Sequence, residues 1–247
     1  MQPTASAEPP VEPIHAAPFA PLPAFNPRTV PVTGVDGHLP AVADSALMPG
    51  ALRARFASPP AWEPEIWREP RFANRTPAQA SVLVPIVMHE RPTVLLTERT
   101  TNLSTHSGQV AFPGGRVDPE DINVAAAALR EAWEEVGLAS RFVEVLGSLP
   151  TYTTGTSFII TPVVALVKPD FELTINPYEV AAAFEVPLAF LMNPANHRRH
   201  ALAWDAPDGQ RERREWFSMP YQDGVNERFV WGATAGMLRN LYRFLSA

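Results

Sequence analysis

Residues 118–138 read DPEDINVAAAALREAWEEVGL, and this stretch decides how the rest of the sequence is interpreted. Apolar residues recur in it at the spacing of one helix face: Ala125, Leu129, Ala132 and Val136. Gly137 follows the last of them, where a glycine commonly ends a helix. The stretch therefore predicts one amphipathic helix that packs these apolar residues inward.

Three glutamates occupy the second half of this helix: Glu131, Glu134 and Glu135. At spacings of i, i+3 and i+4 their carboxylates share a patch roughly 5–6 Å across, which we expect on the side away from the apolar residues. Acidic residues on a helix often form only a solvated face. Like charges this close repel one another, however, and a cation bound between them would relieve the repulsion.

A glycine loop comes just before the helix. The stretch GQVAFPGG, residues 108–115, is strand-like and ends in a Pro-Gly-Gly breaker. Its backbone carbonyls, that of Gly115 among them, and the glutamates of the helix can thus converge on one point. Magnesium takes such oxygen ligands, one or two carboxylates together with waters and substrate phosphates. The pattern indicates a magnesium site, with manganese as the alternative cation.

With these residues in view, the sequence resembles the Nudix hydrolase family. The family's box ends in Arg-Glu, an apolar residue, any residue, Glu-Glu, any residue, Gly and an apolar residue, and residues 130–138 match at every position. The commonest box also has a glutamate eight residues before the arginine, where this sequence has Ile122. The interval from Gly115 to Arg130 is one residue longer than usual. The resemblance covers roughly residues 50–247.

The loop GGRVDPED, residues 114–121, resembles that of a coenzyme A pyrophosphatase-like subgroup of the family. Nine residues on and before this loop also fit the subgroup's pattern: Leu95, Leu96, Thr97, Arg99, Gly108, Phe112, Pro113, Gly114 and Gly115. Thr100 stands where a serine or alanine is usual, and Ser104 replaces an arginine. The resemblance implies magnesium-dependent hydrolysis of coenzyme A or an acyl-CoA to 3',5'-ADP and 4'-phosphopantetheine, which keeps any acyl group.

Two alternatives within the Nudix family remain open at this stage, besides a scaffold or interaction protein that acts through the proline-rich residues 1–50. Because Ser104 replaces a cation, the substrate could be another nucleoside diphosphate derivative, such as ADP-ribose or a dinucleoside polyphosphate. The chain could also be a Nudix module that binds a nucleotide without hydrolysing it, since some members of the family have lost the box carboxylates. All three glutamates are present here, which argues against the second alternative.

The resemblance implies a role for each residue of the box. Glu131 and Glu135 are the expected direct magnesium ligands, joined by the Gly115 carbonyl. Glu134 is either a ligand of a second ion or a proton acceptor. Arg130 is expected to hold a carboxylate bidentately and fix its orientation, in preference to contacting the substrate.

Further candidates lie outside the helix. Glu179 resembles a position near the family's site and is a candidate general base, with an ordinary exposed glutamate as the alternative. Arg99 closes a strand that leads to the site and either contacts a phosphate or forms a structural ion pair. His106 is a candidate phosphate donor or a surface histidine, and the backbones of Gly114 and Gly115 are expected beside the substrate.

The remaining sequence indicates an α/β fold. We expect strands at residues 81–89, 92–99, 143–154, 157–167 and 213–221. Helices are expected at 51–57 and 234–246, and a helix or turn at 176–192. Strands outnumber helices and both types mix, so the expected fold is a Nudix-like α/β/α sandwich, with a mixed sheet between helical layers.

Residues 1–50 contain eleven prolines, spaced too closely for a helix interior or a central strand. We therefore expect an extended or disordered proline-rich extension, followed by a Nudix hydrolase domain at 51–247. The net charge of −6 provides no broad basic field for nucleic acid, so the expected partner is a small-molecule nucleotide. No secretion signal or apolar span is recognisable, which favours the cytoplasm, and a homodimer is compatible with the sequence.

Overall fold

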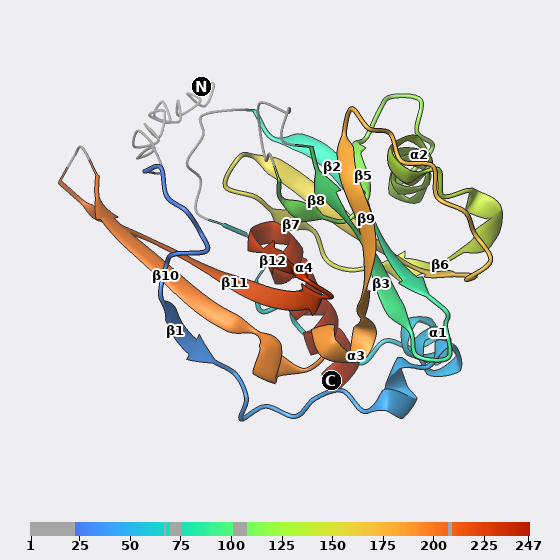
Figure 1. The fold of residues 1–247 in the computed structure, drawn as a ribbon, viewed down its shortest axis with the longest axis horizontal. Coiled ribbons are helices and arrows are strands. Elements are labelled where there is room, and N and C mark those ends of the chain that lie inside the picture. Colours follow the sequence, from blue (N-terminus) through green and yellow to red (C-terminus); the bar gives the residue numbers. More distant parts are fainter. Residues whose placement is uncertain (1–22, 67, 70–75, 101–107, 207–208) are drawn as a thin grey trace, which may run out of the picture.

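A mixed β-sheet with helices on both faces forms the centre of the computed structural model (Figure 1). The structure describes five stretches of the chain: residues 23–66, 68–69, 76–100, 108–206 and 209–247. Within them, no helix combines the length and the hydropathy needed to cross a bilayer. The expected α/β class with a mixed sheet is confirmed.

The central sheet runs in the order β4-β3-β2-β8-β6, with β5 also paired to β2, β7 to β8 and β9 to β3. Its strands are β2 Ala78–Val87, β3 Thr93–Arg99, β4 Val110–Ala111, β5 Gly114–Arg116, β6 Val143–Ser148, β7 Tyr152–Thr153, β8 Phe158–Val167 and β9 Val180–Pro187. The pairing of β2 with β8 is parallel, and the other pairings are antiparallel. The expected strands at 81–89, 92–99, 143–154 and 157–167 all lie in this sheet.

Successive residues of β2 point into two separate hydrophobic cores. Val82, Val84 and Ile86 belong to one core, and Leu83 and Val87 to the other. A strand that is buried on both faces reads as one continuous apolar run, which is why it is recognisable in the sequence. The sheet therefore needs a cover on each side.

Helices supply these covers. Helix α2, Val124–Val136, packs on one face, and α1, Pro49–Ala57, and α4, Gly232–Ser246, contribute to the core on the other. Short helices connect the strands: α3 Leu188–Leu191, η1 Asp44–Leu47, η2 Ser140–Phe142 and η3 Pro194–Asn196. The α/β/α arrangement matches the expectation, and the helices expected at 51–57 and 234–246 are α1 and α4.

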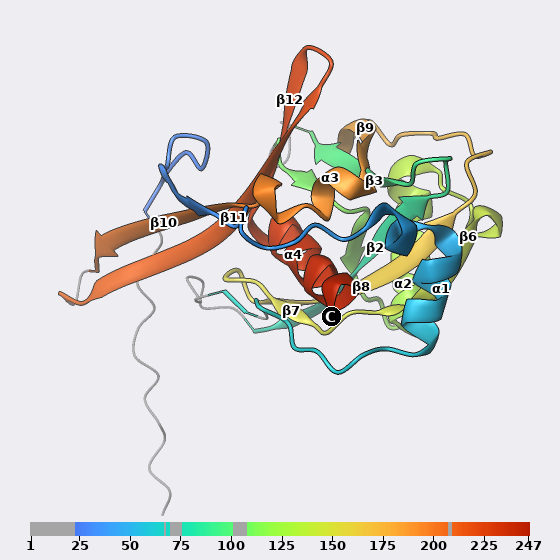
Figure 2. The same ribbon diagram turned by 90° about the horizontal axis from the view of Figure 1, so that it is seen from below.

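A second sheet of four strands lies beside the first. Its order is β1-β10-β11-β12, with all neighbours antiparallel. The strands are β1 Val32–Val35, β10 Arg198–Asp205, β11 Arg211–Asp223 and β12 Asn226–Trp231. The far ends of β10 and β11 project from the rest of the described chain (Figures 1 and 2). Only β11 coincides with a strand expected from the sequence, the one at 213–221.

The expectation of a helix or turn throughout residues 176–192 is wrong for its longest part. The segment forms β9, which pairs with β3 along its whole length, before the single turn of α3. Val180, Phe184 and Val186 are buried and recur at even spacing, which is the period of a strand. The intervening alanines favour a helix only weakly, and pairing with β3 overrides that preference.

The boundary expected at residue 50 lies inside packed structure. Strand β1 pairs with β10, and Val42 and Leu47 are buried in the core shared with α4. Asp36 forms ion pairs with Arg199 and Arg239, whose side chain is 1% exposed. The chain from β1 onward is thus packed against the rest of the described structure. Residues 1–22 lie outside the described residues.

Candidate metal and catalytic site

Two glycines of β5 allow the loop to approach its neighbours closely. A Cβ atom added to Gly114 would lie 2.5 Å from the carbonyl oxygen of Ser81, on the paired strand β2. One added to Gly115 would lie 2.5 Å from the carboxyl group of Glu131. At Gly114 the clash would be with the backbone of β2, so only glycine fits there, whereas a side chain at Gly115 would require the carboxyl group of Glu131 to move. The carboxylate of Glu131 therefore lies directly against the backbone of β5.

Helix α2 is held at both ends. At its start, the Asn123 side chain accepts a hydrogen bond from the backbone N–H of Ala126 at 2.9 Å. At its end, Gly137 has φ 71°, the left-handed conformation that favours glycine. The Ser81 hydroxyl of β2 donates to the Val124 carbonyl at 2.7 Å, which ties the first turn to the central sheet. The glutamates are thereby placed by rigid elements.

The three glutamates differ strongly in burial. The side chain of Glu135 is 4% exposed, that of Glu131 15% and that of Glu134 52%. The backbone N–H of Gly114 donates to Glu135 at 3.2 Å. The sequence predicts that the three carboxylates form one patch on the side of α2 away from its apolar face. This expectation is wrong for Glu135, because α2 packs against β5 and the Glu135 side chain lies beneath the loop.

The electrostatic environment disfavours charge on two of these carboxylates. Burial raises the pKa of Glu135 to about 7, an effect opposed by the Gly114 N–H and Arg99 and reinforced by Glu131. Burial also raises the pKa of Glu131, and Arg130 opposes this rise. Such shifts, caused by burial and neighbouring like charge, are typical of functional sites, and a bound cation would favour the ionised forms.

Arg99 lies where β3 ends, beside the buried glutamate. Its Nη1 is 3.7 Å from Oε1 of Glu135. Its Nε is buried and has no hydrogen-bond partner among the described residues. Both interpretations of Arg99 are thus compatible with its position: it pairs with a site carboxylate, and it retains donors for a phosphate oxygen.

Arg130 contacts carboxylates on two sides of its guanidinium group. Nη1 donates to Glu131 at 3.0 Å and to Glu134 at 3.1 Å. Nε and Nη2 donate to the two oxygens of Asp121 at 3.1 and 2.9 Å. These hydrogen bonds raise the pKa of Arg130 above its ordinary value. The orienting role expected for this residue stays a prediction, which these contacts support.

Glu179 lies close to the glutamates of α2. It is half-buried, accepts a hydrogen bond from the Asn176 side chain at 3.2 Å, and raises the pKa values of Glu131 and Glu135 by its charge. Its backbone carbonyl accepts from the N–H of Thr100 at 3.0 Å, just after β3. The loop before β9 therefore brings a fourth carboxylate into the site.

The structure does not place two of the residues discussed above, and it adds one residue that the sequence does not single out. His106 and Ser104 lie outside the described residues, so the structure does not place them. Asp121 stands out in the sequence only as one acid of the variant loop, yet its carboxylate accepts two hydrogen bonds from Arg130. The sequence signal for Asp121 is an acid nine residues before that arginine. It is easily missed, because the family's usual glutamate lies eight residues before the arginine, where this chain has Ile122, a residue that is 88% exposed.

The oxygen-rich cluster suits a hard divalent cation. It combines Glu131, Glu134, Glu135 and Glu179 with the backbone of Gly115, and it contains no sulfur or imidazole donor among the described residues. Within the same part of the chain, no three carboxylates already enclose one point, since Arg130 occupies two of them. The donor set fits magnesium or manganese, provided that those two carboxylates turn from Arg130 toward the cation.

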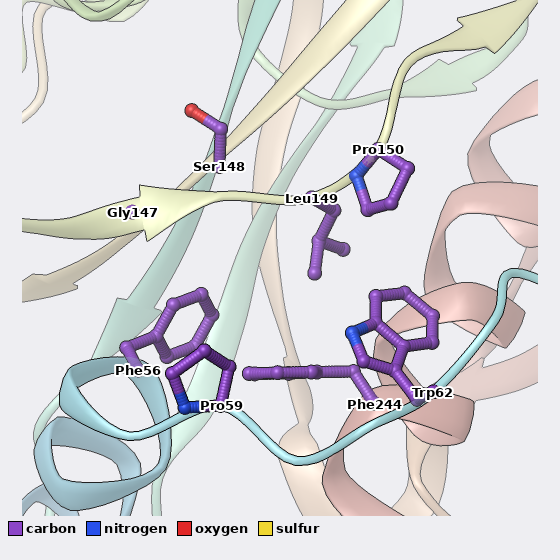
Figure 3. A pocket seen from close by; sticks show the side chains of 8 residues that line it. All are labelled: Phe56, Pro59, Trp62, Gly147, Ser148, Leu149, Pro150 and Phe244. Carbon is purple, nitrogen blue, oxygen red and sulfur yellow. The ribbon is translucent and has the colours of Figure 1, made fainter.

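An apolar hollow of about 430 Å³ lies elsewhere in the fold (Figure 3). Its walls come from α1 and the segment after it, the end of β6 and its connection to β7, and α4. Phe244 lies between Phe56 and Trp62, with its ring centroid 4.8 Å from that of Phe56 and 5.3 Å from that of Trp62 (Figure 3). No acid or base lines it, so it offers no groups for hydrolysis and is separate from the carboxylate cluster.

Comparison with known proteins agrees with this geometry. A model of the NUDIX domain family matches residues 77–205, which include the β5 loop, α2 and Glu179. The chain is 45% identical over 163 residues to the uncharacterized Nudix hydrolase NudL of Enterobacter sp. (strain 638), covering 66% of this chain and 80% of the relative. It is 44% identical over 179 residues to NudL of Shigella flexneri serotype 5b, covering 72% and 86%.

Solved structures show a weaker likeness. An Ap4A hydrolase of C. elegans in a binary complex shares 18% identity, with a TM-score of 0.39, over 48% of this chain and 85% of that one. The Nudix hydrolase RenU of M. smegmatis shares 24% identity, with a TM-score of 0.38, over 50% and 73%. Scores this low support no argument about substrate.

Proposed function

This chain belongs to the Nudix hydrolase family, and from that premise we propose that it hydrolyses the pyrophosphate bond of coenzyme A or of an acyl-CoA. Family membership makes it a pyrophosphohydrolase of a nucleoside diphosphate derivative. The particular substrate is the proposal, together with magnesium or manganese as the cofactor and the cytoplasm as the location.

One observation carries the choice of substrate. The subgroup's upstream pattern and the box are far apart in the sequence, yet Arg99 of the first lies 3.7 Å from Glu135 of the second. Arg99 thus lies beside the proposed site, which supports a role for the upstream pattern in selecting the substrate. Because coenzyme A carries a diphosphate and a 3'-phosphate, an arginine at this place has suitable groups to contact.

The proposed ligands of the cation are Glu131, Glu135 and the Gly115 carbonyl, with Glu134 beside them. When bound there, magnesium supplies charge that neutralises the phosphoryl oxygens and acidifies water. The site is dry enough for this charge to matter, since Glu131 and Glu135 are largely buried. Arg130 holds Glu131 and Glu134 through Nη1, and both carboxylates would turn from it toward a bound cation.

The chain's other residues position the substrate and accept the proton. The guanidinium group of Arg99 donates to a phosphate oxygen of the diphosphate. A water molecule attacks one phosphorus, the bond to the bridging oxygen breaks, and the water's proton passes to Glu179, with Glu134 as the alternative acceptor. For coenzyme A the products are 3',5'-ADP and 4'-phosphopantetheine, and no covalent intermediate is required.

A panel of substrates tests the proposal. The full-length protein is incubated with magnesium and coenzyme A, acetyl-CoA, ADP-ribose or diadenosine tetraphosphate, and the products are identified by mass. We expect kcat/KM for the two coenzyme A compounds to exceed that for the others by about tenfold or more, which corresponds to ~1.4 kcal/mol. Equal or faster cleavage of ADP-ribose would remove the coenzyme A assignment and leave the family assignment intact.

One position of the sequence gives a specific reason to test ADP-ribose and related substrates. Ser104 stands where the subgroup has an arginine, so one cation that could hold a phosphate is missing. The second candidate function is therefore hydrolysis of another nucleoside diphosphate derivative at the same site. The same panel separates the two candidates directly.

A further inference from the structure

The guanidinium group of Arg130 is held between two sets of acids. On one side, Nη1 donates to Glu131 and Glu134. On the other, Asp121 accepts from Nε and Nη2 in a bidentate arrangement. Nη2 also donates to the Arg116 carbonyl at 3.0 Å, and Asp118 lies 3.5 Å from the same nitrogen. Arg130 is thus shared between the site and the loop before α2.

The side chain of Asp121 is itself fixed. It is 6% exposed, and its Oδ2 accepts the backbone N–H of Asp118 at 2.8 Å. The next residue, Ile122, is 88% exposed. The carboxylate of this loop that reaches Arg130 bidentately is therefore that of Asp121, and a bidentate arginine–carboxylate pair has a defined geometry.

This arrangement matters when a cation binds. Arg130 and the cation compete for the same two carboxylates, Glu131 and Glu134. A guanidinium group held only by those carboxylates would block the cation or remain beside it as an uncompensated positive charge. A guanidinium group anchored on the opposite side can release them and stay at the edge of the site.

We propose that Asp121 is a positioning residue that anchors Arg130 away from the cation, and so determines how tightly the site binds a divalent metal. The proposal rests on the proposed function, because it takes Glu131 and Glu134 to be part of the metal site. It concerns cation affinity alone and is independent of which nucleotide is the substrate.

Mn²⁺ titrations by calorimetry test it, with the full-length protein and without substrate. Five proteins are compared: wild type, Asp121→Asn, Glu120→Gln, Arg130→Gln and the double variant Asp121→Asn/Arg130→Gln. Glu120→Gln is the matched control, since it removes the same charge from an exposed neighbouring residue of the same loop. Thermal unfolding without metal is measured for each, so that affinity is read only from folded protein.

We expect Asp121→Asn to bind Mn²⁺ about fivefold or more weakly than Glu120→Gln. In the Arg130→Gln background, the same change at residue 121 should alter the affinity by less than about twofold, because the residue acts through Arg130 and the two effects are then not additive. Asp121→Glu, which keeps the carboxylate, should restore most of the affinity and guards against a folding defect of the asparagine variant.

Two results would overturn the proposal. One is equal Mn²⁺ affinity for Asp121→Asn and Glu120→Gln. The other is a loss of the same size in both Arg130 backgrounds, which would mean that only the charge of residue 121 matters. If the wild type binds no Mn²⁺ at all, the metal site of the proposed function fails, which is a different and recognisable outcome.

Discussion

Nη1 of Arg99 lies 3.7 Å from Oε1 of Glu135, so the end of β3 and the last turn of α2 meet at one ion pair. The glutamate is almost fully buried and the arginine is about a quarter exposed. The glutamate of this ion pair is shielded from solvent, whereas the arginine is partly accessible to solvent, so a substrate can approach from the arginine's side. The predictions below follow from this pair and its neighbours.

Replacing Glu135 by glutamine should leave the fold intact and slow the reaction. Glutamine is nearly isosteric and neutral, and the site already favours the neutral form of this side chain. It is a poorer magnesium ligand, so we expect kcat to fall at least tenfold, on the order of 1.4 kcal/mol in the barrier. Steady-state kinetics at saturating magnesium measure this, and wild-type activity would refute the metal-site assignment.

The contribution of Glu135 to the stability of the metal-free protein should decrease as the pH rises from about 4.5 to about 7. Burial raises the pKa of Glu135 to about 7 in the folded chain, from an ordinary value of 4.5. Between these values this side chain has released its proton in the unfolded chain and keeps it in the folded chain, so its contribution to the free energy of unfolding falls with increasing pH.

Denaturant unfolding with a chelator, at about pH 5 and about pH 7, measures this effect. Glu135→Gln should remove the part of the slope that belongs to this residue, and added magnesium should stabilise the wild type most at the higher pH. The same slope in wild type and variant would mean that Glu135 titrates normally.

Replacing Arg99 by glutamine should weaken substrate binding. The variant keeps much of the side-chain volume but loses the charge that faces Glu135 and the proposed phosphate. We expect kcat/KM for coenzyme A to fall about tenfold or more, mostly through KM. Arg91→Gln, an exposed arginine just before β3, is the matched control. Equal kinetics in the two variants would assign Arg99 to structure alone.

Gly115→Ala tests the close approach of the loop to α2. The new methyl group would lie 2.5 Å from the carboxyl group of Glu131, so either the loop or the side chain must move. We expect a large loss of activity and of Mn²⁺ affinity with the protein still folded. Gly50→Ala is the control, because nothing lies within 4 Å of a Cβ at that position. It should leave activity unchanged, and unaltered activity in Gly115→Ala as well would contradict the proposed contact.

Much of the fold could be predicted because the decisive patterns are local. The run around Leu83 is apolar on both faces, the box residues recur at helical spacing, and Gly137 ends α2 in the left-handed conformation. Strand β1 could not be predicted in this way, because Val32 pairs with His200 and no local pattern encodes a partner so distant in the sequence.

The candidate site, like the fold, is only partly predictable from the sequence. The identity of the acids on α2 follows from the sequence, whereas their burial does not. Helical spacing places Glu131 and Glu135 on one side of α2, but only the position of β5 decides that Glu135 lies beneath the loop. The bidentate contact between Asp121 and Arg130 likewise depends on a loop conformation that the spacing of residues in the sequence does not specify.

A crystal of the protein soaked in Mn²⁺, with anomalous scattering recorded, tests the central claim most directly. The account predicts an anomalous peak coordinated by Glu131 and Glu135 next to the backbone of Gly115, with Arg130 still bound to Asp121. A map in which the carboxylates point away from one another into solvent, with no peak near them, would contradict it.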